Sequence, residues 1–528
     1  MWGIDRLSGG RHSFVRKRLR NGTTAVLTHA AALDRRGRGT LEVLDELGVV
    51  PTVLFTPEHG FDGWAQAEES VPSAPARDDL AVQSDRGAPH RVSLYGSDRD
   101  SLTPSDEQLN GISALVIDLV DIGSRYYTYV WSALLAARKA ASLGVHTVIL
   151  DRPNPLGSNP EQLEGKPQAD GFLSFVGLEP IAIRHGLTIA ELLTAFLSRD
   201  GLQPGPDGAF TVVGCKGWER WRTQEAWGRP FIPPSPNMPS LETALMYPGG
   251  CLVEGTNLSE GRGTSFPFRV VGAPFIDGKR LAKELGALQL PGVVVRPTAF
   301  KPTFEKHAGT LCHGVMLHVT NAASFRPVAT YLSLLTLARA QAPSDFTFRR
   351  EAYEFEAERL AFDLLTGSSL AREAMEAGAS ATEVADLISP VGPEVKELWA
   401  SLEPQLSKAT AQPATAHGGH SLSPQHSSQN DGSDMDDGQE PREDTAQTEA
   451  DTLGPSESSM AIDAQAGDVS GASSSEINAV INSQGEVGVG CAAREATSAA
   501  TSFTTENSNT SDSTDTLSAV EDDSPFES

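Results

Sequence analysis

Residues 114–150 read ALVIDLVDIGSRYYTYVWSALLAARKAASLGVHTVIL, and this stretch decides the fold class. Residues 114–120 are a near-continuous apolar run, residues 130–143 are an Ala- and Leu-rich helical pattern ended by Gly144, and residues 146–150 are a second apolar run. Apolar runs that flank a helix are typical of parallel strands buried on both faces. The stretch therefore predicts one unit of a Rossmann-like parallel α/β sheet.

Earlier parts of the chain repeat this alternation. Residues 24–28, 52–56 and 91–95 are short runs rich in β-branched side chains, and residues 40–47 form a helical stretch between the first two. We therefore expect them to add strands and a covering helix to the same sheet.

A change in the order of elements predicts a second domain. Residues 278–288 and 327–339 are helical patterns, and strands are expected near Val293 and Val315. Helices and strands no longer alternate regularly here, which indicates a smaller α+β domain.

The chain is thus divided into four segments. These are an N-terminal extension (residues 1–22), a Rossmann-like domain (23–264), a smaller α+β domain (265–408) and a C-terminal tail (409–528). The tail contains 22 acidic residues, 2 basic residues and 33 Ser or Thr. Such a composition buries too little apolar surface to offset the entropy of ordering, so we expect an acidic, disordered tail.

Composition excludes several functional classes. The 528 residues carry 42 Lys and Arg against 69 Asp and Glu, a net charge of −27, which argues against a nucleic-acid partner. The four cysteines form no CxxC or Cys/His cluster, so no metal site is expected. No apolar run reaches the ~18 residues of a membrane span, and no signal peptide is visible. We expect a cytoplasmic protein without a membrane partner, and the oligomeric state is not predicted.

Acidic residues follow three of the apolar runs. Glu58 comes after the run at residues 52–56, Asp118 and Asp121 lie at the end of the central run, and Asp151 follows residues 146–150. The carboxyl ends of parallel strands meet at one edge of a sheet, where ligands bind. Each acid alone is also consistent with a helix cap or a loop ion pair, but their joint placement favours a site.

The sheet carries no phosphate-binding motif. Neither GxGxxG nor GxxxxGK[ST] follows a strand, so no nucleotide cofactor is expected. The Gly-rich segment at residues 254–264 contains Glu254, Glu260 and Arg262, and its two glutamates would repel a phosphate. It suits neutral hydroxyls, or a carboxylate held against Arg262. A tight linker loop with an internal ion pair is an equal alternative.

Several long motifs together resemble one family. The motifs are PEHG (57–60), DLVDIGSRYYTY (118–129), DRPNP (151–155), RHGLT (184–188), PSPNMP (234–239), EGTNLSEGRGT (254–264) and KPTFEKHAG (301–309). In this order they resemble the NamZ-type exo-β-N-acetylmuramidases, glycoside hydrolases of peptidoglycan turnover, over about residues 22–400. A departure is Ala67-Glu68, where the family has Ala-Gly.

The resemblance implies an enzyme that releases terminal N-acetylmuramic acid from the non-reducing ends of peptidoglycan fragments, without metal or cofactor. It also implies that the Rossmann-like domain is the catalytic domain and that the smaller domain closes a cleft between them. It implies that Glu58 is catalytic, and we expect this residue to be the general acid, with Asp118 or Asp121 as a second catalytic group. A catalytically weakened relative that binds the sugar as a sensor or scaffold is the alternative.

The expected substrate-binding residues surround these acids. They are His59, Arg125, Tyr127, Asp151, Arg152, His185, Asn237, Glu254, Asn257, Glu260 and Arg262. N-acetylmuramic acid carries a lactyl carboxylate that N-acetylglucosamine lacks, and guanidinium groups bind carboxylates well. We therefore expect Arg125, Arg152 or Arg262 to recognise the lactyl group.

Overall fold

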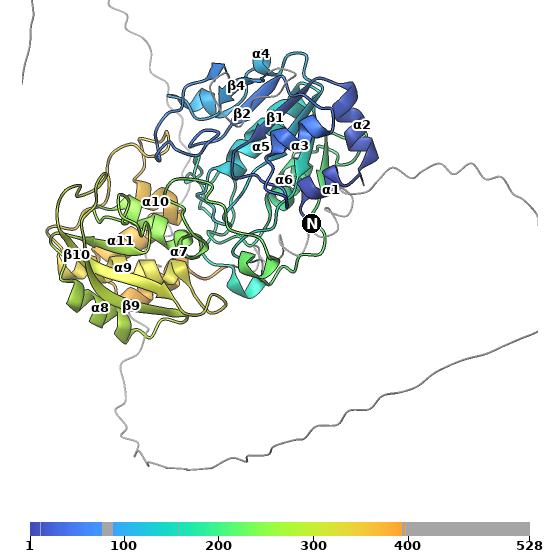
Figure 1. Ribbon diagram of the computed structural model, residues 1–528. Helices are drawn as coiled ribbons and strands as arrows, with labels where there is room; N and C mark the ends of the chain where they lie inside the picture. Colours follow the sequence, from blue (N-terminus) through green and yellow to red (C-terminus); the bar gives the residue numbers. More distant parts are fainter. Residues whose placement is uncertain (11, 76–87, 158, 393–396, 398–528) are drawn as a thin grey trace, which may run out of the picture. The chain divides into compact units, whose positions relative to one another are not determined.

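The structure is a computed structural model that describes residues 1–10, 12–75, 88–157, 159–392 and 397 (Figure 1). The tail expected at residues 409–528 lies outside the described residues. Among the described residues, no helix has the length and apolar character needed to cross a membrane.

A seven-stranded sheet in the order β3-β4-β2-β1-β5-β6-β7 forms the first domain. Its strands are β1 (Thr24–Thr28), β2 (Val53–Thr56), β3 (Ala74–Pro75), β4 (His90–Ser93), β5 (Ala114–Asp118), β6 (His146–Leu150) and β7 (Phe210–Val213). All neighbouring pairs are parallel except β3 with β4. The six parallel strands, taken in chain order, stand as 3-2-1-4-5-6, the Rossmann order. The predicted fold class is confirmed.

Alternate side chains of the strands enter two separate cores. Leu115 and Ile117 of β5 belong to the core formed with α5 (Tyr129–Ser142) and α6 (Ile189–Arg199). Val116 between them belongs to the core on the other face. This period of two explains the continuous apolar runs in the sequence, because both faces of the sheet are covered.

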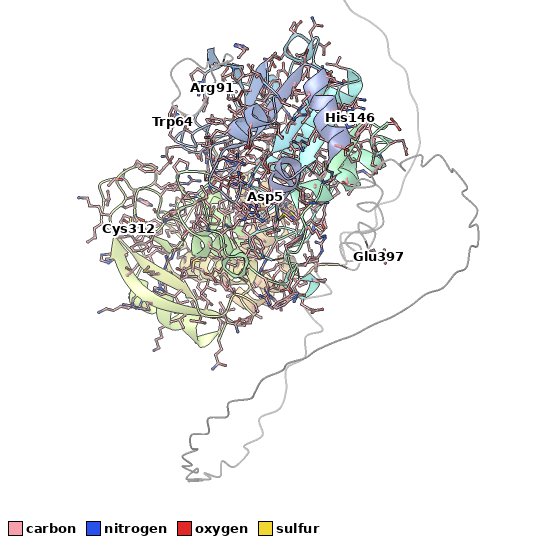
Figure 2. All side chains as sticks on the ribbon, turned by 45° about the vertical axis from the view of Figure 1, so that its right-hand side comes forward. Asp5, Trp64, Arg91, His146, Cys312 and Glu397 are labelled. Atoms are coloured by element: carbon pink, nitrogen blue, oxygen red, sulfur yellow. The ribbon has the colours of Figure 1, made fainter. Side chains whose placement is uncertain are left out.

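The second face is covered by α1 (Gly3–Ser8), α2 (Ser13–Asn21) and α3 (Thr40–Glu46). The backbone N–H of Gly3 donates to the carbonyl oxygen of Asp151 at 2.8 Å. Asp5, labelled in Figure 2, accepts the backbone N–H of Arg35 at 2.9 Å and pairs with Arg229. Residues 1–10 and 12–22, expected as part of an extension, therefore contribute helices that pack against the sheet in this structure.

The smaller domain contains a three-stranded antiparallel sheet in the order β8-β10-β9. Its elements are α7 (Leu241–Gly250), β8 (Val270–Ala273), α8 (Gly278–Ala287), β9 (Val293–Phe300), β10 (Cys312–Val319), α9 (Pro327–Gln341), α10 (Ala361–Thr366), α11 (Leu370–Glu376) and α12 (Ala381–Ile388). Figure 1 shows α8, β9 and β10 together. The expected α+β character is confirmed.

Short helices connect the larger elements of both domains. They are η1 (Arg99–Leu102), α4 (Asp106–Leu109), η2 (Pro160–Gln162), η3 (Gln224–Trp227) and η4 (Cys251–Gly255). The last of these follows α7 directly and delivers Glu254 to the site described below.

The close approach of α1 to the sheet gives a test by substitution. A Cβ atom at Gly3 would lie 2.4 Å from the carbonyl oxygen of Val213 and 2.5 Å from the amide nitrogen of Asp151. Both contacts are with backbone, so Gly3→Ala should lower the free energy of unfolding by on the order of 1–3 kcal/mol in urea denaturation.

Gly286→Ala in α8 is the matched control, because a Cβ atom there meets nothing within 4 Å. Alanine favours a helix over glycine, so this variant should gain up to ~1 kcal/mol. Equal unfolding midpoints for the two variants would contradict the described packing of α1.

Candidate active site

A cavity lies beyond the carboxyl end of β2, between the sheet domain and loops of the smaller domain. Its lining includes five of the expected substrate-binding residues together with Glu58: His59, Tyr127, Asn237, Glu254 and Arg262. The remaining lining residues are Ala67, Tyr126, Thr128, Ser235, Met238, Tyr247, Phe268, Tyr353 and Glu354.

Glu58 lines this cavity, and hydrogen-bond donors hold its carboxyl group. The Thr128 hydroxyl donates to Glu58 Oε2 at 2.6 Å, and the backbone N–H of Glu68 reaches Oε1 at 3.5 Å. His59 Nε2 lies 3.9 Å from Oε1, and its Nδ1 contacts the Ala65 carbonyl oxygen at 2.8 Å. The carboxyl group is therefore fixed by the segments that follow β2 and β5.

A buried ion-pair network forms another wall of the cavity. Arg262 Nη2 donates to Glu254 Oε1 at 2.7 Å, and Arg262 Nε lies 3.2 Å from Glu260 Oε1. Lys306 Nζ lies 2.9 Å from Glu260 Oε2. Burial opposes ionisation of Glu260, but Lys306 and Arg262 outweigh it and lower its pKa. Tyr353 completes the network by donating its hydroxyl to Glu254 Oε2 at 2.8 Å.

Asp118 and Arg152 lie outside this cavity and engage each other. Arg152 Nε donates to Asp118 Oδ1 at 2.6 Å and Arg152 Nη2 to Oδ2 at 2.9 Å. The Thr40 hydroxyl also donates to Oδ2 at 2.6 Å. Both carboxylate oxygens of Asp118 are thus engaged within the protein, which gives this residue the geometry of a structural ion pair.

Asp121 lines a different cavity, of about 200 Å³, together with Arg152. Burial raises the pKa of Asp121 to about 7, although the backbone N–H groups of Gly123 and Ile122 oppose the shift. Its neighbour His185, with Nε2 at 3.5 Å from Asp121 Oδ2, has its pKa lowered to about 3 by burial. Residues of the loop after β5 therefore line two cavities: Asp121 lines this one, and Tyr127 and Thr128 line the cavity that contains Glu58.

The other expected residues hold loops in place. Arg125 is fully buried and donates to the carbonyl oxygens of Lys166, Ile181 and Leu365. Asn257 bonds the backbone of Asp345 and Thr347 through its side chain.

Asp151 has its pKa raised to about 6, because burial outweighs the hydrogen bonds from Thr188 and the backbone. Within the part of the chain that the structure describes, no group of three or more His, Cys, Asp or Glu side chains could hold a metal ion.

Comparison with known proteins identifies the family. The family model for the N-terminal part of exo-β-N-acetylmuramidase NamZ matches residues 24–242, and the model for its C-terminal part matches residues 245–394. The chain is 38% identical over 370 residues to the peptidoglycan β-N-acetylmuramidase NamZ of Bacillus subtilis, covering 70% of this chain and 83% of that relative. The chain belongs to the NamZ family. The resemblance seen in the sequence is confirmed.

Two crystal structures of DUF1343 family proteins from Bacteroides fragilis share the fold. One has a TM-score of 0.64 at 26% identity and the other 0.54 at 25%, and each match covers 76% of this chain and 97% of the solved chain. The arrangement of the two domains seen here thus recurs in solved structures.

Three functional candidates were missed by sequence reasoning. Thr128 lies within a quoted motif but gave no separate signal, and Tyr95 follows β4 without a charged neighbour. Glu354 belongs to a loop of the smaller domain, far in sequence from every strand end of the first sheet. In addition Glu68 adopts a φ of 61° and pairs with Arg349 at 2.8 Å.

The different surroundings of Asp118 and Glu58 predict different effects on substitution. Asp118→Asn leaves the buried Arg152 guanidinium without its counter-charge, which should cost about 3–5 kcal/mol of unfolding free energy. The folded fraction should keep kcat within a few fold of wild type. Denaturant unfolding and steady-state kinetics measure the two effects.

Asp200→Asn breaks the half-exposed pair with Arg138 and serves as the control, with an expected loss below ~1 kcal/mol. A stable Asp118→Asn protein with a collapsed kcat would place Asp118 in the chemistry instead.

Proposed function

We propose that this protein is an exo-acting glycoside hydrolase that releases terminal β-linked N-acetylmuramic acid from the non-reducing ends of peptidoglycan fragments. Membership of the NamZ family and the B. subtilis relative support a peptidoglycan β-N-acetylmuramidase. The observation that carries the proposal is the carboxyl group of Glu58, presented in a cavity between the domains and fixed by Thr128.

Glycoside hydrolysis needs a carboxyl group at the scissile bond. One group protonates the leaving oxygen while a second group, or the substrate's own acetamide, acts at the anomeric carbon. Glu58 is proposed as a catalytic carboxyl group because it is the strand-end acid of the sheet that opens into this cavity and accepts hydrogen bonds from Thr128 and Glu68. Asp118 and Asp121 are proposed to support the strand-end loops.

Arg262 is proposed to recognise the lactyl carboxylate of N-acetylmuramic acid. Of the three expected arginines it is the one in the lining of the Glu58 cavity, whereas Arg152 is paired with Asp118 and Arg125 with backbone carbonyls. Glu254 and Glu260 hold its guanidinium group in one orientation. A fixed guanidinium loses little entropy when it binds a carboxylate.

Other expectations stay predictions. These are the cytoplasmic location and the absence of a nucleic-acid partner, both based on the sequence. The binding-only alternative gains no support from the family or from the geometry at Glu58.

Glu58→Gln tests the catalytic role. A catalytic carboxyl group typically contributes 10²- to 10⁴-fold, so kcat on a natural muramyl disaccharide should fall by about that factor while the substrate Kd changes little. Glu69→Gln, an exposed carboxyl in the following loop, is the matched control. Near-wild-type kcat in Glu58→Gln would exclude Glu58 from the mechanism.

Arg262→Lys tests the selectivity. Lysine keeps the charge between Glu254 and Glu260 but loses the planar fork that matches a carboxylate. The ratio of kcat/KM for nitrophenyl N-acetylmuramide over nitrophenyl N-acetylglucosaminide should fall about ten-fold, which corresponds to ~1.4 kcal/mol. Arg269→Lys, outside the cavity lining, should leave the ratio unchanged. An unchanged ratio in Arg262→Lys would assign lactyl recognition to another group.

A further inference from the structure

Glu354 presents a further carboxyl group to the cavity lined by Glu58 and Glu254. Its side chain is buried, with 7% of the residue exposed, and it lines the cavity together with Glu58 and Arg262. It lies in the smaller domain, between Tyr353 and the partly buried Phe355. Of the three carboxyl groups in the lining, Glu254 is paired with Arg262, which leaves Glu58 and Glu354.

An unfavourable backbone conformation places Glu354 there. Tyr353 and Glu356 exchange two backbone hydrogen bonds, of 2.8 and 3.0 Å, across a two-residue turn. Glu354 and Phe355 form the centre of this turn, with φ values of 50° and 64°. Turns with both central residues at positive φ favour Asn and Gly, so Glu and Phe are strained at these two positions. Such strain at a cavity wall points to a functional position.

Packing against the sheet domain maintains the turn. The Phe355 ring lies 5.2 Å from the Tyr95 ring and 6.3 Å from Phe175, measured between centroids. The Tyr95 hydroxyl donates to Glu354 Oε2 at 2.9 Å. The carboxyl group of Glu354 is thus bonded directly to a residue of the first domain.

The register of the sheet brings Tyr95 next to Glu58. Thr56 at the end of β2 pairs with Ser93 at the end of β4. Glu58 and Tyr95 each follow two residues later on these neighbouring strands. Glu354, bonded to Tyr95, is therefore located beside the proposed catalytic Glu58, and both line one cavity.

We propose that Glu354 is the second catalytic carboxyl group and donates the proton to the leaving glycosidic oxygen, while Glu58 acts as a carboxylate at the anomeric centre. This inference rests on the proposed muramidase function. It moves to Glu354 the proton-donating role that the sequence alone suggests for Glu58.

The surroundings of Glu354 support its protonated state. Burial first, and then repulsion from Glu58 and Glu68, raise the pKa of Glu354 well above its ordinary value, while the bond from Tyr95 acts in the opposite direction. Environments that separate the pKa values of neighbouring carboxyl groups are how glycosidases assign acid and base roles. The titratable and charged groups that face it are Glu58, Glu68 with its partner Arg349, Tyr95, and Glu254 with its partner Arg262.

The step balances with one water molecule. The proton of Glu354 moves to the leaving oxygen as the C1–O bond breaks, and the bonding electron pair stays on that oxygen. The hydroxyl of water ends on C1, and the remaining proton of water returns to the carboxyl pair. The pair therefore carries one proton before and after each turnover.

Glu354→Gln, measured on two substrates, tests the assignment. On a natural muramyl disaccharide kcat should fall by about 10²- to 10⁴-fold, as for loss of a general acid. On nitrophenyl N-acetylmuramide, whose leaving group needs little protonation, the loss should shrink to below about ten-fold, whereas Glu58→Gln should lose activity on both substrates. Glu358→Gln, an exposed carboxyl four residues along, is the matched control.

The pH profile supplies an independent readout. A proton donor is lost as pH rises through its pKa, so kcat/KM of wild type should fall on the alkaline side, and Glu354→Gln should lack this limb. Glu354→Asp keeps a carboxyl group on a side chain one methylene shorter, so kcat/KM should be lower but should still fall on the alkaline side. This variant tests the assignment if the Gln variant does not fold.

Two results would overturn the assignment. One is a folded Glu354→Gln protein with near-wild-type kcat on the disaccharide, and the other is an equal loss on both substrates with the alkaline limb intact. If wild type failed to hydrolyse any N-acetylmuramide, the proposed function itself would be rejected and Glu354 with it. Wild-type turnover therefore separates the two failures.

Discussion

The bidentate ion pair between Asp118 and Arg152 fixes the strand ends on which the site is built. It joins the end of β5 to the loop after β6, and the Arg152 guanidinium also donates to the Leu33 carbonyl oxygen beyond β1 at 2.9 Å. The Thr28 hydroxyl adds a 2.8 Å bond to the Asp118 carbonyl oxygen. Three adjacent loops are thereby held at the point where the strand order reverses.

The pattern of apolar runs was enough to predict the parallel sheet and the acidic residues at its strand ends. The apolar runs around Ile117 and Ile149 are continuous because both faces of their strands are covered, so the Rossmann-like domain could be read from residues 114–150 alone. Acids at the strand ends followed from the same pattern. The pattern could not show that Glu58 and Asp118 have different surroundings. A position at a strand end does not reveal whether the carboxyl group is bonded to a hydroxyl group, as in Glu58, or to a buried guanidinium group, as in Asp118.

Glu354 was beyond the reach of sequence reasoning for a physical reason. Its approach to Glu58 depends on a contact between domains, through Tyr95, that spans 259 residues of sequence. The turn that carries it contains neither Asn nor Gly, the residues that would indicate a positive φ. In contrast Glu254, Glu260 and Arg262 lie within nine residues of one another, so their ion pairing could be anticipated from the loop itself.

The strained turn at Glu354 and Phe355 also bears on how this enzyme could be stabilised. Glycine adopts a left-handed backbone conformation without steric cost, so Gly at position 354 would relieve the strain of this residue. Such a change would remove a buried carboxyl group from the cavity while leaving Arg262 and its neighbours in place. A substitution chosen to relieve backbone strain alone would thus remove the carboxyl group to which proton donation is assigned above, so backbone strain and the proposed chemistry meet at a single residue.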